Sequence, residues 1–147
     1  MAENTVPIWG KTPKIDSVLV TAANTSSQGG GTVATDIFKA ATIGANGGYV
    51  SMIQWIPTAT TPTTTTGTVG RIFKSTVTSG STASGDTFLI WEQSLQALGA
   101  DNATTAVPSY VQIINQPFPA NATILATNHA APAANTAWRC VVYWTDY

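Results

Sequence analysis

The sequence predicts an all-β protein: a single jelly-roll-like antiparallel β-sandwich of about eight strands, with an extended N-terminal arm. Short runs of β-branched and aromatic residues alternate with clusters of Gly, Pro, Asn and Ser, which is typical of strands joined by turns. Helical periodicity is nearly absent, so the helices that a parallel βα fold needs between its strands are missing. The 147 residues suffice for one domain with its own hydrophobic core.

Eight runs have the composition and length of strands, and we expect Pro57 to end the third of them. Eight strands in one domain suit a double-sheet jelly roll. An immunoglobulin-like sandwich is the competing fold, but the chain lacks the Cys–Trp–Cys framework of that fold. The sandwich domain is therefore expected to span residues 15–147, with strands at 15–21, 35–42, 49–56, 68–78, 87–96, 110–118, 122–127 and 137–144.

Residues 1–14 form the predicted arm. Pro7 and Pro13 disfavour both a helix and a central strand, so this segment should be extended and separate from the sandwich. Trp9 lies between the two prolines, directly after Ile8, and burying such an aromatic ring is worth roughly 2–3 kcal/mol. We expect Ile8 and Trp9 to dock on a neighbouring subunit or another protein; a frayed tail is the alternative.

Several runs carry apolar residues on both faces of the predicted strand. A strand of this kind belongs to a sandwich whose outer side is also covered, for example by neighbouring subunits. Charged residues make up only 9% of the chain, against roughly 25% in an average globular protein, and a surface so poor in charge also suits burial against other subunits. In the third run the alternation places Val50, Met52, Gln54 and Ile56 on one face of the strand and Tyr49, Ser51, Ile53 and Trp55 on the other. In the last run it places Trp138, Cys140, Val142 and Trp144 on one face and Arg139, Val141, Tyr143 and Thr145 on the other.

The charge balance and hydropathy exclude two classes of partner. A net charge of −1 gives no basic field for a phosphate backbone, so nucleic acid is not an expected partner. No segment approaches the ~20 apolar residues of a membrane helix, and the N-terminus lacks the basic and apolar regions of a signal peptide. We therefore expect no membrane association and no secretory routing by this N-terminus.

The residues that usually carry catalysis or bind metals are sparse. His129 is the only histidine, and the acidic residues are not spaced as a metal-binding loop, so we expect neither a metal nor another cofactor, and no enzymatic activity. A small β-fold enzyme of the cupin type, the alternative from another class, would need a cluster of His and carboxylate ligands. Cys140 is the only cysteine, which rules out an intrachain disulfide, and is expected to be a small buried hydrophobic residue.

Aromatic and charged residues on the strands supply candidate contacts. The five tryptophans, at positions 9, 55, 91, 138 and 144, are expected to pack in the core and at subunit interfaces, and a carbohydrate-stacking platform is the alternative. Arg71 and Glu92, each beside apolar strand residues, are candidates for an intersubunit ion pair. The possible contact residues, with a neighbouring subunit or with another protein, are Ile8, Trp9, Arg71, Glu92, Trp138 and Tyr147.

From Gly47 onward, seven segments follow one another in an order that resembles a known family, although Trp91 and the polar stretch 93–99 depart from it. The family is the small single-jelly-roll virion proteins of tailed bacteriophages, which serve as capsid decoration (cement) proteins or fibre-like projections. The span that contains them, from Gly47 to Tyr147, covers about two thirds of the chain. The segments are GGYVSMI (47–53), VGRIFK (69–74), the Ser/Gly/Thr turn 79–85, FLIWE (88–92), YVQIINQPF (110–118), PANATILAT (119–127) and AANTAWRCVVYWTDY (133–147).

The resemblance implies a homotrimer, made in the host cytoplasm, that sits on the outer capsid surface near three-fold symmetric points. Its partner there would be the major capsid protein, whose adjoining subunits it would brace. The resemblance implies no catalytic residues. A trimeric receptor- or carbohydrate-binding knob of a virion fibre or tail is the alternative; such a knob is normally joined to a stalk, and this chain is too short to contain one.

Overall fold

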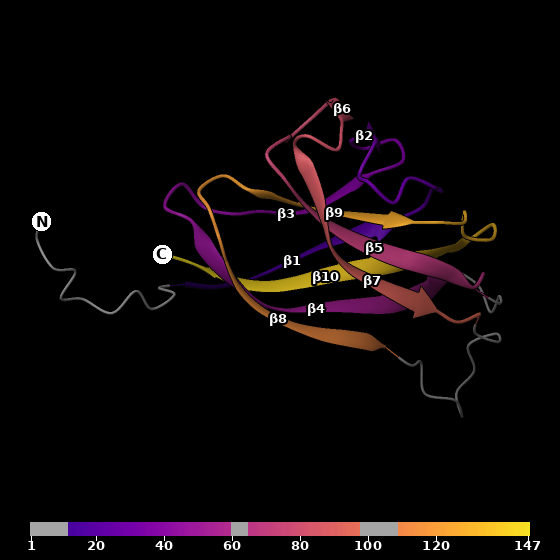
Figure 1. The fold of residues 1–147 in the computed structure, drawn as a ribbon. Coiled ribbons are helices and arrows are strands. Elements are labelled where there is room, and N and C mark those ends of the chain that lie inside the picture. The colour runs from indigo at the N-terminus through magenta and orange to yellow at the C-terminus, as the bar shows by residue number, and fades with distance from the viewer. Residues whose placement is uncertain (1–11, 60–64, 98–108) are drawn as a thin grey trace, which may run out of the picture.

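The computed structural model describes residues 12–59, 65–97 and 109–147 (Figure 1). All regular secondary structure in these ranges is β-structure, which confirms the predicted all-β class. Most of the predicted arm, residues 1–11, and the docking role expected of Ile8 and Trp9 lie outside the described residues. The last three residues of the predicted arm, 12–14, belong to the first strand. This strand begins at Thr12 rather than at Ile15 and pairs along its whole length with the last strand.

Two four-stranded sheets form the sandwich, and every pairing between their strands is antiparallel. Sheet 1 has the order β1-β10-β4-β8, and sheet 2 the order β3-β9-β5-β7. A short ribbon of two further strands, β2 and β6, completes the set. The bounds are β1 (Thr12–Val20), β2 (Gly31–Thr32), β3 (Phe38–Thr42), β4 (Gly48–Ala59), β5 (Thr68–Ser75), β6 (Ser81–Thr82), β7 (Thr87–Leu95), β8 (Tyr110–Phe118), β9 (Thr123–Asn128) and β10 (Thr136–Asp146).

The order of the strands is that of a jelly roll. Apart from the two-residue strands, the chain visits sheet 1 at β1, β4, β8 and β10 and sheet 2 at β3, β5, β7 and β9, so that the first and last strands become neighbours. Eight long strands in two antiparallel sheets with these crossings match the predicted double-sheet architecture. Each of the eight predicted runs overlaps one long strand.

The prediction that Pro57 ends the third run is wrong. Strand β4 continues through Pro57, which lies opposite Trp138 of β10. Strand β8 pairs with β4 only as far as Trp55, so among the described residues no strand pairs with that side of β4 at Pro57. A free edge tolerates the missing N–H of proline, whereas a fully paired central position does not.

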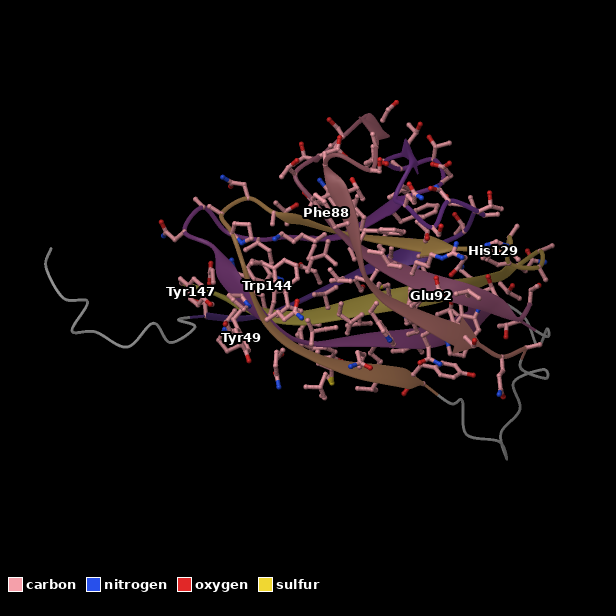
Figure 2. The ribbon with its side chains drawn as sticks, viewed as in Figure 1. Tyr49, Phe88, Glu92, His129, Trp144 and Tyr147 are labelled. Carbon is pink, nitrogen blue, oxygen red and sulfur yellow. The ribbon has the colours of Figure 1, made fainter. Side chains whose placement is uncertain are left out.

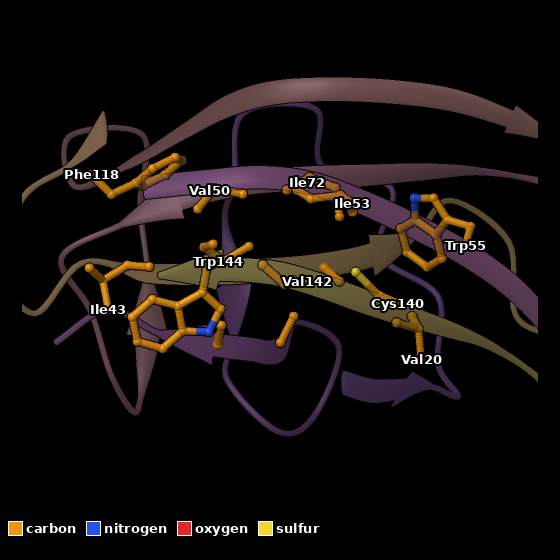
Figure 3. Close-up of a cluster of buried hydrophobic side chains, with 14 of the residues drawn as sticks. Val20, Ile43, Val50, Ile53, Trp55, Ile72, Phe118, Cys140, Val142 and Trp144 are labelled. Atoms are coloured by element: carbon orange, nitrogen blue, oxygen red, sulfur yellow. The ribbon is translucent and has the colours of Figure 1, made fainter. Parts of the chain in front are cut away.

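The main core lies between the two sheets and is dominated by aromatic and branched side chains. Trp55, Ile53 and Val142 of sheet 1 pack toward Ile72 of sheet 2, and all four are fully buried (Figure 3). Cys140 is also fully buried, which confirms its predicted role as a small hydrophobic residue.

A β-bulge changes the predicted faces of β4. Ser51 is an extra residue relative to β10, because Tyr143 pairs with Met52 while the next residue of β10, Trp144, pairs with Val50. Val50 and Ile53 are therefore both buried on the inner face, although strict alternation had placed them on opposite faces. In β10 the predicted alternation is confirmed: the inward side chains of Trp138, Cys140, Val142 and Trp144 are all buried.

Part of the outer face of sheet 2 has its own cover. Ile37, Phe73 and Leu125 form a second buried cluster there, next to the β2–β6 ribbon that lies over this sheet (Figure 1). Gly29, close to this ribbon, has a φ of +78°, and a Cβ at this position would collide with the side chain of Thr87. Within the described residues, the outer face of sheet 1 has no comparable cover, and large apolar side chains stay exposed on it.

The contact between Gly70 of β5 and Trp55 of β4 gives a test of the core. A Cβ at Gly70 would lie 2.9 Å from both the Trp55 ring and the Leu95 side chain, so Gly70→Ala should lower the free energy of unfolding by about 1–3 kcal/mol. Gly85→Ala is the control, because a Cβ there meets nothing within 4 Å, and its effect should stay below about 0.5 kcal/mol. Urea denaturation measures both, and equal stabilities would show that Trp55 does not depend on Gly70.

Candidate interaction surface

The outer face of sheet 1 presents rows of side chains that cross all four strands. One row consists of Ile15, Tyr143, Met52 and Ile113, each directly opposite the next on β1, β10, β4 and β8. The adjacent row consists of Ser17, Val141, Gln54 and Val111. We call these two rows, together with Leu19 and Ile56 of the row beyond, the apolar face of sheet 1.

The most exposed members of the apolar face lie on its two edge strands. On β1, Ile15 is 66% exposed and Leu19 39%; on β8, Ile113 is 55% exposed and Val111 49%. Between them, Val141 of the central strand β10 is 6% exposed. Four large aliphatic side chains on one sheet face form the kind of apolar patch that marks a protein contact in soluble proteins.

Polar groups on this face are bonded to one another. The Tyr143 hydroxyl donates to Oε1 of Gln54 at 3.0 Å, and Nε2 of Gln54 donates to the Ser109 hydroxyl at 3.0 Å. The Arg139 guanidinium donates to the Ser17 hydroxyl at 3.2 Å. Covering the face with another protein therefore preserves these hydrogen bonds and avoids much of the penalty for burying unpaired polar atoms.

Strand β8, one edge of the face, is shaped against open-ended sheet extension. Asn115 has a φ of +49° at a point where the register between β4 and β8 shifts, and Pro117 follows two residues later. Bulges and prolines interrupt the row of backbone groups that another strand would need for pairing. An added strand at the β8 edge is therefore disfavoured.

Arg71 and Glu92, which were expected to pair between subunits, form an ion pair within one chain. The two residues are directly opposite each other on β5 and β7, and Nε of Arg71 lies 2.7 Å from Oε2 of Glu92. A guanidinium nitrogen of Arg71 also lies 3.2 Å from Nδ1 of His129 (Figure 2 labels His129 and Glu92). Arg71 is only 7% exposed, because these partners and the neighbouring strands enclose it.

The remaining predicted contact residues differ in position. Trp138 is wholly buried in the core of its own chain, and its Nε1 donates to the Thr66 carbonyl oxygen, so no part of this side chain is left for an intermolecular contact. Tyr147 is partly exposed next to the 44–48 turn, and its backbone N–H donates to the Gly47 carbonyl oxygen (Figure 2). The exposed aliphatic residues of β1 and β8 were not among the predicted contact residues. The sequence feature that indicates them is the presence of apolar residues on both faces of several strands.

The tryptophans of the described residues do not form a stacking platform. Trp55, Trp138 and Trp144 are buried in the main core, and Trp91 is partly buried against it. Nε1 of Trp144 donates to Oδ2 of Asp16 at 2.7 Å, and the Lys14 ammonium lies 4.6 Å from the centroid of the Trp144 ring. These contacts assign the four rings to packing.

Two ionisable groups have pKa values that depart from the ordinary ones. Burial raises the pKa of the Cys140 thiol, because no water or cation stabilises a thiolate in the core. Hydrogen bonds from the Ala83 N–H and the Thr87 hydroxyl lower the pKa of Asp86 in the turn before β7. In the part of the chain that the structure describes, no three His, Cys, Asp or Glu residues are grouped to hold a metal ion, and no helix could span a membrane.

Comparisons with known proteins return no match: no family model, no curated protein and no solved structure matches this chain. The apolar face is therefore the feature of the described structure on which a functional proposal can be based.

The buried thiol predicts a chemical behaviour. In the folded protein Cys140 should not react with Ellman's reagent over hours at pH 8, because it is 0% exposed and its pKa is raised. In 6 M guanidinium chloride one thiol per chain should react within minutes. Rapid reaction of the native protein would contradict the position of Cys140 in the core.

Proposed function

We propose that this chain is a structural, non-enzymatic virion protein, a homotrimeric capsid decoration (cement) protein that binds the major capsid protein on the outer shell of a tailed bacteriophage. The apolar face of sheet 1 supports the homotrimer in this proposal, because large aliphatic side chains exposed together on one face mark a protein contact site. The jelly-roll strand order and the resemblance of the segments after Gly47 to such virion proteins support the same role.

A sandwich of this design suits a protein that strengthens a shell. Its two sheets are tied together by a continuous core, so it acts as a rigid block rather than as a hinge. A rigid block that contacts two adjoining shell subunits must lose one contact before the subunits separate, and each contact adds roughly 25 cal/mol per Å² of apolar surface buried. Because the protein would bind the assembled shell and not the free shell subunits, its binding would stabilise the assembled shell by mass action.

The oligomeric part of the proposal is tested with the full chain in solution. Light scattering at micromolar concentration should give about 46 kDa, three times the chain mass of 15.3 kDa. A stable species of 15.3 kDa would contradict the homotrimer.

The location is tested by cryo-EM of virus particles that contain the chain. Density for the sandwich should lie on the outer capsid surface, near three-fold symmetric points. Density at a fibre or tail tip would contradict the decoration role and favour a receptor- or carbohydrate-binding knob.

A further inference from the structure

We propose that three copies turn the apolar face of sheet 1 toward a common three-fold axis running along the strands, so that Ile15 of one copy packs against Ile113 of the next. The inference rests on the homotrimer of the proposed function and adds the surface and the residue pair that would form it.

The exposed apolar side chains occupy opposite edges of one face. Ile15 and Leu19 are on β1, whereas Val111 and Ile113 are on β8, with β10 and β4 in between. Three strand spacings separate the two edges, roughly 14 Å. Two unlike patches at opposite edges of one face can meet head to tail in neighbouring copies, and such contacts close into a ring when the rotation between copies allows it.

The cross-strand register specifies which residues meet. Ile15 and Ile113 are the two ends of a single row, and a row runs across the strands. Rotation about an axis along the strands leaves each row at its own height. The β1 end of a row in one copy therefore meets the β8 end of the same row in the next, while Tyr143 and Met52, in the middle of this row, face the axis.

The area of the apolar face can be compared with the area that a trimer of this chain would bury. The edge strands β1 and β8 each have nine residues. At about 3.3 Å per residue and about 4.8 Å per strand, four such strands present a footprint of roughly 600 Å². Each face is shared between two neighbours, so a closed trimer would bury about 1,800 Å² in total, or about 600 Å² at each of its three contacts. A single contact of this size is below the roughly 1,200 Å² of a stable pairwise interface, so the trimer depends on closing the ring. The whole face, rather than one edge alone, is thus needed for a stable trimer.

The chemistry of the face also favours a second copy over a charged partner. The residues of the apolar face carry no charge, and Arg139, which lies between Leu19 and Ile56 in the row beyond, donates a hydrogen bond to the Ser17 hydroxyl of the same chain. The Tyr143 hydroxyl and the Gln54 side chain are hydrogen-bonded to each other. An equally apolar surface with its polar groups already paired can cover such a face without leaving a buried charge or an unpaired donor.

Disulfide trapping in the full-length protein tests the predicted pair, and the burial of Cys140 keeps the native thiol out of the reaction. Under a mild oxidant, the double variant Ile15→Cys/Ile113→Cys should run as a covalent trimer on a non-reducing gel. Each single variant should stay unlinked, and a mixture of the two single variants should give a linked dimer. Self-linking of either single variant would overturn the inference in favour of a two-fold arrangement.

Charge substitutions give an independent test with a matched control. Ile113→Asp should raise the concentration at which the trimer dissociates at least tenfold, whereas Phe88→Asp on β7 of sheet 2 should leave it unchanged, although both native side chains are 55% exposed. Circular dichroism verifies that both variants fold. A wild-type trimer that Ile113→Asp leaves intact would overturn this inference but not the proposed function; a monomeric wild type would overturn both.

Discussion

Strand β10 is the element on which the rest of the structure depends. It lies between β1 and β4 in sheet 1, and its inward row of Trp138, Cys140, Val142 and Trp144 fills much of the space between the sheets. Because β10 comes last along the chain and pairs with the first strand, the core closes only when the two ends of the described chain meet. The opposite side of β10 carries Val141 and Tyr143, so one strand supports both the core and the apolar face.

Local patterns were sufficient for the strands but not for their exact faces. The eight long strands follow from runs of β-branched and aromatic residues, and the alternation in β10 predicts its buried side correctly. In β4 the extra residue at Ser51 shifts every later side chain by one position, and Pro57 is tolerated because β8 stops short of it. Both effects arise from pairing with distant strands, which no local pattern contains.

The candidate surface was predictable in kind but not in its residues. Low charge and apolar residues on both faces of a strand correctly suggested exposed apolar surface, but the residues singled out included Trp138, which is in the core, and Arg71, which pairs with Glu92 in the same chain. Aliphatic residues such as Ile15 and Ile113 become exposed because β1 and β8 are edge strands of sheet 1. Whether a strand lies at an edge depends on the order of strands in the sheet, and no local sequence pattern determines that order.

A crystal structure of the assembled full-length protein tests the central claim most directly, namely that copies of this sandwich associate through the apolar face of sheet 1. The account predicts three copies around an axis along the strands, with Ile15 of each copy in contact with Ile113 of the next. An assembly in which the apolar face of sheet 1 points to solvent would contradict it.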